Sequence, residues 1–356
     1  MKILVTGATG NIGSAVLRAL EGRGHCVTGV ARRPPRDVTE REPTVAWTAL
    51  DLSDPGSLPA LRGLVEQSEA VVNLAWAFQP MRDPGYLQRA SVGILEGVAG
   101  LALASPATRL VHVSSVAVYS PRRSDARVDE GAAREGIPGA TYSRLKVEAE
   151  QELWLAAARH DAHERVAVLR PCLVGQRLAG GPMLRCGTPA IMPGALLRRL
   201  PALPVDERFG IQMVHANDVA DAVVRVVETG ASGPFNLASE PVLRGVDIAR
   251  ALDARPVRVR QEVARSLVEV AWRLHLHPLD PGWVDMALQA PWVDAGRARE
   301  VLGWRPQYDA RAVLAELVAG MSAGAGAGTS ALRPRRLTDG LEGLVVRGTV
   351  ARRRMT

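Results

Sequence analysis

The first half of the chain alternates short apolar runs with longer helical patterns, and this alternation limits the possible folds more than any other feature. Parallel strands need long crossover connections, and a helix is the usual connection. Strands that alternate with helices therefore predict an α/β protein with a doubly wound parallel sheet. The expected strands are residues 3–6, 27–31, 70–74, 110–114 and 166–170, and the expected helices are residues 14–23, 54–65, 86–104 and 142–160.

The composition changes after residue 171, where proline, glycine and arginine become frequent. This change predicts a first domain at residues 1–171 and a smaller C-terminal substrate-binding region at residues 172–320. Within the second region, residues 210–238 are expected to pack back on the first domain. Further helices are expected at residues 218–228, 262–275 and 310–321, with Asn217 or Asp218 as the cap of the first, and a short strand is expected at residues 235–237.

Residues 322–330 read Ser-Ala-Gly-Ala-Gly-Ala-Gly-Thr-Ser, a low-complexity stretch that predicts a flexible linker. We therefore expect residues 321–356 to form a flexible basic tail. The formal net charge of the chain is +7, and residues 322–356 contribute +5 of it through seven arginines and two acidic residues. The rest of the chain is nearly balanced in charge. We interpret the tail as a solvated extension and expect no nucleic-acid partner.

The composition also indicates a compartment. A hydrophobic content of 47% with 23% charged residues is typical of a soluble globular protein. No apolar run is expected to span a bilayer, and the first residues enter a strand pattern directly, so we expect no membrane contact and no signal peptide. Cys26, Cys172 and Cys186 are far apart and lack metal-binding spacing. The sequence therefore predicts a cytoplasmic protein with reduced thiols and no metal.

A glycine-rich turn, Thr-Gly-Ala-Thr-Gly-Asn-Ile-Gly at residues 6–13, links the first expected strand to the first helix. Glycines permit a tight turn and let the backbone approach a pyrophosphate, which then lies at the helix N-terminus. The strand–turn–helix context at the start of a βαβ unit supports this interpretation. The sequence therefore predicts a dinucleotide-binding turn, with contacts from Gly7, Thr9, Gly10, Asn11, Ile12 and Gly13.

The residues after the second strand bear on the choice of cofactor. NAD sites usually place a carboxylate there, which binds the 2′-hydroxyl of the adenosine ribose. This chain has Arg32 and Arg33 instead, and two guanidinium groups can bind a 2′-phosphate. We therefore predict NADP as the preferred cofactor and NAD as the alternative. Asp51 and Leu52, after a third short strand, are expected to lie near the adenine.

Lysine is rare in this chain, because 42 of its 44 lysines and arginines are arginine and only Lys2 and Lys146 are lysine. Lys146 lies four residues after Tyr142, a pairing for which four tyrosines and two lysines give a chance expectation of about 0.02. Arginine is always charged and forked, whereas the lysine ammonium is compact and can tune the pKa of a neighbour. Residues four apart share one face of a helix. The pair therefore indicates a chemical role.

Two serines end the expected strand at residues 110–114. Ligands of open α/β sheets bind beyond the carboxyl ends of the strands, which places Ser114 and Ser115 beside the cofactor. Tyr142 would donate or accept a proton at a carbonyl or alcohol oxygen, and Ser115 would hydrogen-bond that oxygen. The ordinary pKa of tyrosine, about 10, is too high for a base at neutral pH. A nearby ammonium and a cationic oxidised nicotinamide would lower this pKa.

These motifs resemble those of an extended short-chain dehydrogenase/reductase of the NAD(P)-dependent epimerase/dehydratase type. The resemblance covers roughly residues 1–320, and it rests on landmarks at residues 6–13, 73–75, 114–119, 142–146, 170–171, 214–220 and 302–306. It implies a Rossmann sheet, with Ser115 as the donor to the substrate oxygen, Tyr142 as the acid/base and Lys146 as a group that also binds the nicotinamide ribose.

The same resemblance implies further contacts and an oligomeric state. Leu74, Ala75 and Pro171 are expected to border the cofactor, together with Tyr142 and Lys146. In this family, the helices equivalent to residues 86–104 and 142–160 pair across a dimer. A homodimer is therefore expected.

Three positions depart from the family pattern. Ser91 stands where the family often has asparagine, so a complete proton relay is not implied. Val116-Ala117 replaces the Asp-Glu pair of sugar-nucleotide dehydratases, which disfavours 4,6-dehydration. Residues 172–176 lack the tyrosine and asparagine that are common in nucleotide-sugar binders. Trp76 and Phe78 are equally candidates for a pocket wall and for the core.

The leading hypothesis is an NAD(P)-dependent oxidoreductase that transfers hydride at a carbonyl or secondary alcohol carbon of a small molecule. One alternative is a nucleotide-sugar epimerase that works by transient oxidation. The other is a non-catalytic NAD(P)-binding sensor, since one fold supports many functions. The presence of Ser115, Tyr142 and Lys146 favours an enzyme, because a pure binder does not need them. The motifs assign no substrate.

Overall fold

The computed structural model describes residues 1–35, 45–77, 83–188, 193–274 and 279–335. The largest sheet has seven strands in the order β10-β6-β5-β4-β1-β2-β3, and all neighbouring strands are parallel. The predicted doubly wound parallel sheet is therefore confirmed. Its strands are β1 (Lys2–Thr6), β2 (Cys26–Ala31), β3 (Val45–Ala49), β4 (Ala70–Asn73), β5 (Arg109–Val113), β6 (Val166–Pro171) and β10 (Gly233–Leu237).

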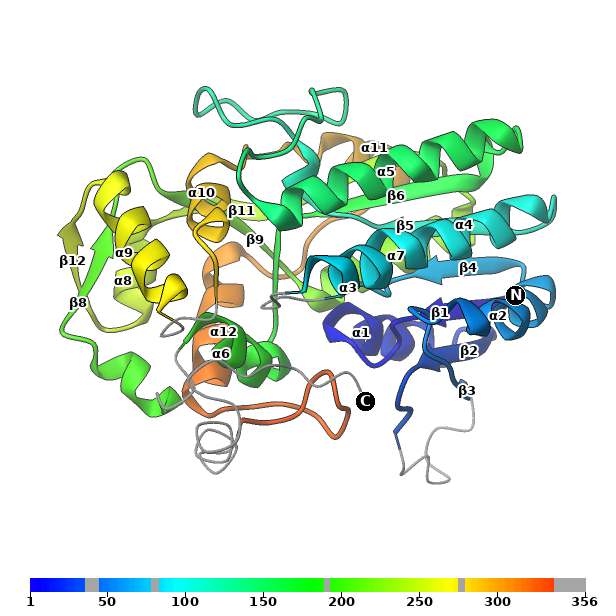
Figure 1. Ribbon diagram of the computed structural model, residues 1–356, viewed down its shortest axis with the longest axis horizontal. Coiled ribbons are helices and arrows are strands. Elements are labelled where there is room, and N and C mark those ends of the chain that lie inside the picture. Colours follow the sequence, from blue (N-terminus) through cyan, green and yellow to red (C-terminus); the bar gives the residue numbers. More distant parts are fainter. Residues whose placement is uncertain (36–44, 78–82, 189–192, 275–278, 336–356) are drawn as a thin grey trace.

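Helices cover both faces of this sheet (Figure 1). Successive strand residues point to opposite faces, so Ile3 packs with the first group of helices and Leu4 with the second. Because both faces are buried, the strands appear in the sequence as continuous apolar runs. The first group is α1 (Asn11–Leu20), α7 (Ala216–Thr229) and α11 (Gly296–Leu302), and the second is α2 (Leu58–Glu66), α3 (Pro84–Gln88), α4 (Ile94–Ala104) and α5 (Thr141–Arg159).

The helix expected at residues 86–104 has three parts, because a π-helical segment, Arg89–Gly93, joins α3 to α4. The expectation that no apolar segment is long enough to span a bilayer is wrong. Among the described residues, Pro84–Ala104 is long and apolar enough to do so. However, 56% of its apolar window is buried inside the protein. Leu95 lies in the same core cluster as the strand residue Val71. This is therefore a core helix of the sheet.

The smaller C-terminal region contains two further sheets. In one, β9 (Gly210–His215) lies between β7 (Leu173–Gly175) and β11 (Ser239–Arg244), and in the other β8 (Ala202–Val205) pairs with β12 (Arg255–Arg258). Its helices are α6 (Gly180–Gly187), α8 (Gly245–Ala251), α9 (Gln261–Arg273), α10 (Gly282–Gln289) and α12 (Ala310–Ser322). Short 3₁₀ turns cover Pro55–Ser57, Val116–Val118, His163–Arg165, Arg177–Ala179 and Gly194–Arg199. Between β9 and β11 the chain returns to the large sheet as α7 and β10.

The cap of α7 is His215, and the predicted cap at Asn217 or Asp218 is wrong. His215 Nδ1 accepts a hydrogen bond from the N–H of Asn217 at 3.1 Å. The Asp218 carboxylate instead accepts from the N–H of Gln307 at 2.9 Å, and the Trp304 indole N–H donates to the Asp218 carbonyl at 2.8 Å. The start of α7 therefore holds the segment that leads into α12.

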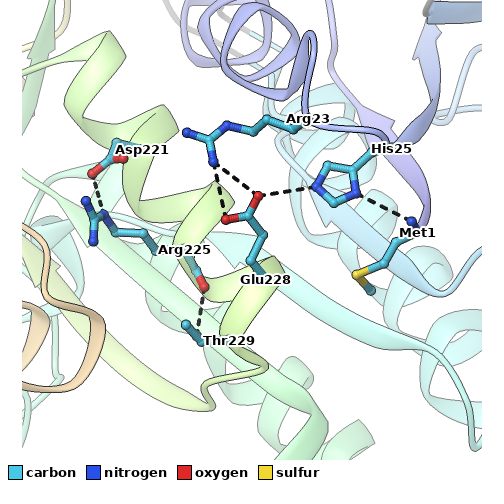
Figure 2. Close-up of polar contacts among 7 residues, drawn as sticks. All are labelled: Met1, Arg23, His25, Asp221, Arg225, Glu228 and Thr229. Carbon is cyan, nitrogen blue, oxygen red and sulfur yellow. Dashed lines mark hydrogen bonds and ion pairs between the residues drawn. The ribbon is translucent and has the colours of Figure 1, made fainter.

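The far end of α7 is tied to the N-terminal strands (Figure 2). Glu228 pairs with Arg23 at 3.1 Å and contacts His25 at 3.4 Å, and the other ring nitrogen of His25 lies 3.4 Å from the Met1 amino group. The Glu228 side chain is 38% exposed, so these contacts are weak, at about 0–1 kcal/mol each. The buried apolar residues of α1 and α7 hold the two helices together.

The segment 323–335 differs from the flexible linker that the sequence predicts. Leu332 is 2% exposed, and the Arg335 guanidinium donates to the Leu184 carbonyl and the Thr188 hydroxyl at 2.9 and 2.8 Å. The segment therefore packs against α6. The remainder of the predicted tail, residues 336–356, lies outside the described residues.

A buried ion pair joins α5 to β6. Arg170 is fully buried, and its Nη2 and Nε donate to Glu150 at 2.6 and 3.0 Å. Arg170 also donates to the Tyr119 hydroxyl at 2.9 Å, which in turn donates to Asn236 of β10 at 2.7 Å. Burial raises the pKa of Tyr119 to about 12, against the lowering effect of Arg170. The Tyr119 phenol therefore stays protonated at neutral pH, and the network fixes α5 against β6 and β10.

We predict that Glu150→Gln destabilises the fold by about 3–5 kcal/mol, because it leaves the Arg170 guanidinium buried without a counter-charge. Urea denaturation followed by circular dichroism measures the loss. The matched control is Asp221→Asn, which removes the partly exposed partner of Arg225 (Figure 2). This control should cost at most about 1 kcal/mol. Equal losses of unfolding free energy in the two variants would show that the buried pair contributes no more to stability than the exposed pair.

Candidate active site

The glycine-rich turn lies between β1 and α1, as predicted. Gly7 has a φ of +64°, and a Cβ there would lie 2.7 Å from the backbone of Leu74 and Ala75. A Cβ on Gly13 would lie 2.3 Å from the Gly7 carbonyl. Only glycine fits these positions, so the turn is compact and presents the first N–H groups of α1, which have no acceptor within the helix. This geometry fits a dinucleotide pyrophosphate, because anions bind at helix N-termini.

The turn faces the loop that follows β4. The strand order of the sheet reverses between β1 and β4, and ligands of open α/β sheets bind at such a point. The Thr6 hydroxyl donates to Asn73 at 2.6 Å, and the N–H of Ala75 donates to the same hydroxyl oxygen at 3.4 Å. Leu74 and Ala75 therefore border the crevice beside Gly7. Their contact with a cofactor stays a prediction.

Arg32 and Arg33 follow β2 at the same edge of the sheet, and both are exposed. Arg32 Nη1 donates to the Tyr86 hydroxyl at 2.8 Å. Tyr86 lies on α3, so this bond places the guanidinium between β2 and the helices that follow β4. The contact of the two arginines with an adenosine ribose stays a prediction.

Asp51 and Leu52 lie beyond the end of β3. The Asp51 carboxylate accepts from the N–H and the hydroxyl of Ser53 at 3.0 and 2.7 Å, so it stabilises its own turn. Leu52 is partly buried against the core cluster of α2 and α4. Both residues have a local structural role, and the predicted contact with adenine remains a prediction.

Ser115 and Tyr142 meet at the carboxyl end of β5. Ser115 begins the 3₁₀ turn Val116–Val118, where its hydroxyl oxygen accepts from the N–H of Ala117 at 3.2 Å. Tyr142 is the second residue of α5 and lies beside Ser115. Burial raises the pKa of Tyr142 to about 12, against a smaller lowering effect of Ser115. The phenol is therefore neutral at physiological pH and can donate a proton.

Lys146 lies one turn further along α5 and is 3% exposed. Its ammonium donates to the Val113 carbonyl at 3.2 Å and lies 5.9 Å from the centre of the Tyr142 ring. Burial lowers the pKa of Lys146 to about 7, although the Glu150 carboxylate raises it. This lowered pKa brings the titration of Lys146 towards neutral pH, whereas an arginine stays charged. The strand end of β5 and one face of α5 thus bring the three predicted catalytic residues together.

Two indoles flank the ring of Tyr142. Trp76, after β4, lies edge-on at 6.2 Å between ring centres, and Lys146 Nζ is 3.5 Å from the centre of the Trp76 ring. Trp283 of α10 lies on the ring at 5.4 Å. Because α10 belongs to the C-terminal region, the two parts of the chain meet over Tyr142. Trp76 also packs against the core cluster of α2 to α5, so both interpretations of this residue stay predictions, and Phe78 lies outside the described residues.

Polar side chains are buried beneath this site. Burial, with the Lys146 charge as a second cause, lowers the pKa of His112 well below its ordinary value, so the ring is neutral. Among the described residues, the buried hydroxyls of Ser91 and Ser114 have no hydrogen-bond partner. Ser91 lies in the π-helical segment, at the position where the family often has asparagine. Buried hydroxyls of this kind usually bind ordered water, so the floor of the site suits water.

The loop after β6 returns to the glycine-rich turn. Pro171 ends β6, where it is in register with Leu237 of β10. Gln176, a few residues later, donates from Nε2 to the backbone and side-chain oxygens of Asn11 at 2.8 and 2.7 Å. Gln176 thereby orients a predicted cofactor residue. Sequence reasoning missed Gln176 and Trp283, because no local pattern connects either residue to a partner so distant in the chain.

Comparison with known proteins identifies the family. Residues 3–238 match the NAD dependent epimerase/dehydratase family. The chain belongs to this family. The match includes the glycine-rich turn and the set of Ser115, Tyr142 and Lys146, in agreement with the resemblance in the sequence. The protein is therefore an NAD(P)-dependent enzyme of the short-chain dehydrogenase/reductase type, and the alternative of a non-catalytic sensor is wrong.

Individual members of the family vary in activity. The 3-diazoavenalumate denitrifying reductase of a Streptomyces species is 29% identical over 324 residues, which are 86% of this chain and 97% of the relative. The crystal structure of gox2253 is 25% identical with a TM-score of 0.67, and the match covers 89% of this chain and 97% of that chain. The UDP-glucuronic acid 4-epimerase of Bacillus cereus, solved with NAD, is 17% identical with a TM-score of 0.65 over 90% of this chain and 98% of its own. At 17% identity, the likeness to the epimerase shows a shared fold and nothing more.

We predict that Lys146→Met stabilises the enzyme at low pH, on the order of 2–4 kcal/mol at pH 6. The pKa of Lys146 falls from an ordinary 10.5 to about 7 on folding, mainly through burial. Between these two values the unfolded chain binds a proton that the folded protein does not, so the stability of the wild-type protein rises with pH. The gain from Lys146→Met should therefore shrink steadily as the pH rises from 7 to 10.

Urea denaturation at several pH values measures this difference between variant and wild type. Lys2→Met, which removes the exposed second lysine of the chain, is the control and should leave the profile unchanged. A difference for Lys146→Met that does not depend on pH would show that the lysine is not titrating in the folded protein.

Proposed function

We propose that the protein is a reductase that transfers hydride from a reduced nicotinamide cofactor, preferably NADP, to a carbonyl-type carbon of a small molecule. The observation that carries this proposal is the placement of Ser115, Tyr142 and Lys146 together at the edge of the sheet where ligands bind, with Lys146 Nζ 5.9 Å from the centre of the Tyr142 ring. The bound cofactor supplies the hydride. Ser115 and Tyr142 hold the acceptor oxygen, and Tyr142 donates its proton as negative charge develops there.

The protonation states of the site support the reductive direction. A reductase needs Tyr142 as an acid, whereas an epimerase must first use it as a base. Burial raises the pKa of Tyr142 to about 12, so the phenol carries its proton at neutral pH, as the reductive direction requires. Lys146, with its ammonium 5.9 Å from the phenol ring, stabilises the phenolate that remains after the proton has left. The relative from Streptomyces is also named as a reductase. The nucleotide-sugar epimerase is the alternative.

The indoles beside Tyr142 indicate the shape and polarity of the acceptor molecule. Trp76 and Trp283 pack against the phenol ring, with centroid distances of 6.2 and 5.4 Å. Aromatic rings pack well in offset or edge-to-face arrangements with such walls, at about 0.5–1.5 kcal/mol per pair. We therefore propose a flat, largely apolar acceptor rather than a sugar with its many hydroxyls. A second candidate reaction is the reductive loss of nitrogen from a diazo compound, which the name of the Streptomyces relative favours.

The preference for NADP rests on Arg32 and Arg33. Both side chains follow β2, and neither position carries the carboxylate that usually reads a ribose 2′-hydroxyl. Arg32 donates to Tyr86, which holds it near the expected ribose. A solved structure of an NAD-bound relative leaves the choice open for this chain.

We further propose a cytoplasmic homodimer. The α4 and α5 helices pack side by side on one face of the sheet, as the family resemblance requires for the dimer contact. The outward side of α5 carries Leu155, which is 50% exposed.

Tyr142→Phe is expected to lower kcat/KM by about 10²–10⁴, the usual contribution of a general acid. The assay follows the absorbance of the reduced cofactor with aromatic aldehydes, aliphatic aldehydes, diazo compounds and nucleotide sugars as acceptors. Epimerisation gives no net absorbance change and is detected from the isomers formed. Tyr308→Phe, in a ring that stacks on His215 away from Ser115, should retain full activity. Wild-type turnover in Tyr142→Phe would remove this residue from the mechanism.

For the cofactor, Arg33→Ala should raise the Kd for NADP about 10- to 100-fold and leave the Kd for NAD unchanged, because the lost bond reaches a charged phosphate. Arg32→Ala should act in the same direction. Titration of the intrinsic tryptophan fluorescence measures both constants. Arg62→Ala, an exposed arginine on α2, is the control for net charge. If both site variants keep the NADP preference, the arginines do not read the 2′-phosphate.

A further inference from the structure

A hairpin at the C-terminal end of the described chain reaches the glycine-rich turn. Residues 324–335, here called the C-terminal hairpin, leave α12 and run towards α1 as the orange-red loop of Figure 1. At the tip, the Thr329 hydroxyl donates to the carbonyl of Thr9 at 3.0 Å. The same hydroxyl oxygen accepts from the N–H of Leu332 at 3.3 Å. Thr329 is therefore held from both sides, and its partner is a residue of the dinucleotide-binding turn.

Backbone hydrogen bonds close the two arms of the hairpin on each other. The N–H of Ala327 donates to the Leu332 carbonyl at 2.7 Å, and the N–H of Arg335 donates to the Gly324 carbonyl at 3.1 Å. The Leu332 side chain is buried. Two cross-arm bonds and a buried apolar anchor give this segment a defined shape.

The base of the hairpin is bound to α6 in the C-terminal region. The N–H of Gly181 donates to the Ala325 carbonyl at 2.6 Å, and the Arg335 side chain binds the last turn of α6, as described above. Arg185 of α6 donates to the Arg333 carbonyl. The hairpin thus connects the C-terminal region at its base with the cofactor turn of the large sheet at its tip.

Steric contacts explain why several positions of this segment are glycine. A Cβ on Gly326 would lie 2.2 Å from the Leu332 carbonyl oxygen, and one on Gly181 would lie 2.7 Å from the Ala325 carbonyl oxygen. Gly324 has a φ of +58°, which strains other residues. By contrast, a Cβ on Gly328 meets nothing within 4 Å. Most glycines of the Gly-Ala repeat are therefore required by close packing or by a turn, and the repeat does not act as a flexible spacer.

We propose that the C-terminal hairpin is a clasp on the dinucleotide site, which slows the release of the bound cofactor. It contributes Thr329 to the outer side of the turn that fits the pyrophosphate. A cofactor bound there lies on the α1 N-terminus, and its departure requires the parts that cover this turn to move aside. The bond from Thr329 to Thr9 opposes that movement. The proposal rests on the dinucleotide binding of the family and is independent of the acceptor that the enzyme reduces.

The opposite role would be a plug, in which the hairpin occupies the place of the cofactor and has to leave before binding. The two roles predict opposite effects. Loss of a clasp speeds cofactor dissociation and weakens binding. Loss of a plug speeds association and tightens binding, and would overturn the proposal. Rates of cofactor binding therefore separate the two roles without any need for turnover.

The experiment uses the full chain and NADPH, with NADH as a second probe. Stopped-flow fluorescence measures dissociation when excess oxidised cofactor displaces the bound reduced form. Thr329→Val keeps the shape of the side chain and removes its hydroxyl, and it should raise the dissociation rate about fivefold, the factor for one hydrogen bond of about 1 kcal/mol. Thr329→Ser keeps the hydroxyl and should behave as the wild type.

Gly326→Ala tests the hairpin as a whole, with Gly328→Ala as its matched control. The first forces a Cβ against the Leu332 carbonyl and should raise the dissociation rate at least as much as Thr329→Val. The second points into open space and should leave the rate unchanged. Circular dichroism checks that every variant is folded. An unchanged dissociation rate in folded Thr329→Val and Gly326→Ala would overturn the clasp, while cofactor binding itself would still support the family function.

Discussion

The buried pair of Arg170 and Glu150 fixes the position of the catalytic helix, and the site depends on that position. Glu150 follows Lys146 by one helical turn, so its bond to β6 sets how far α5 can slide or rotate along the sheet. Burying two charges is unfavourable, and this cost is offset by the two hydrogen bonds between them and by the further bond from Arg170 to Tyr119. The ion pair thereby places Tyr142 and Lys146 over the end of β5.

The same pair sets the charge of the site. Arg170 engages both carboxylate oxygens of Glu150, so Glu150 only partly offsets the burial of Lys146. Burial is thus the larger influence on the pKa of Lys146, which it lowers to about 7. The site holds a neutral phenol beside a lysine that titrates near neutral pH. In such a site the phenol carries its proton at neutral pH, as the proposed reduction requires.

Local patterns in the sequence were enough to predict the sheet, the glycine-rich turn and the pair of Tyr142 and Lys146. Each of these depends on residues within one element or at one strand end, where periodicity and spacing are visible. Trp283 and Gln176 could not be predicted, because their partners Tyr142 and Asn11 become neighbours only through the tertiary fold. His215 replaced the expected cap of α7 because Asp218 is used to bind a distant segment.

The hairpin shows how composition alone can mislead. Alternating glycine and alanine is typical of a flexible spacer, yet Gly326 is required by contact with Leu332, which a composition argument cannot see. The C-terminal region now touches the cofactor domain at both ends of the crevice, through Trp283 on Tyr142 and through Thr329 on Thr9. A shift of this region changes both contacts together. With the acceptor site and the clasp proposed above, acceptor binding at one contact and cofactor retention at the other would be coupled, and linkage makes such a coupling reciprocal.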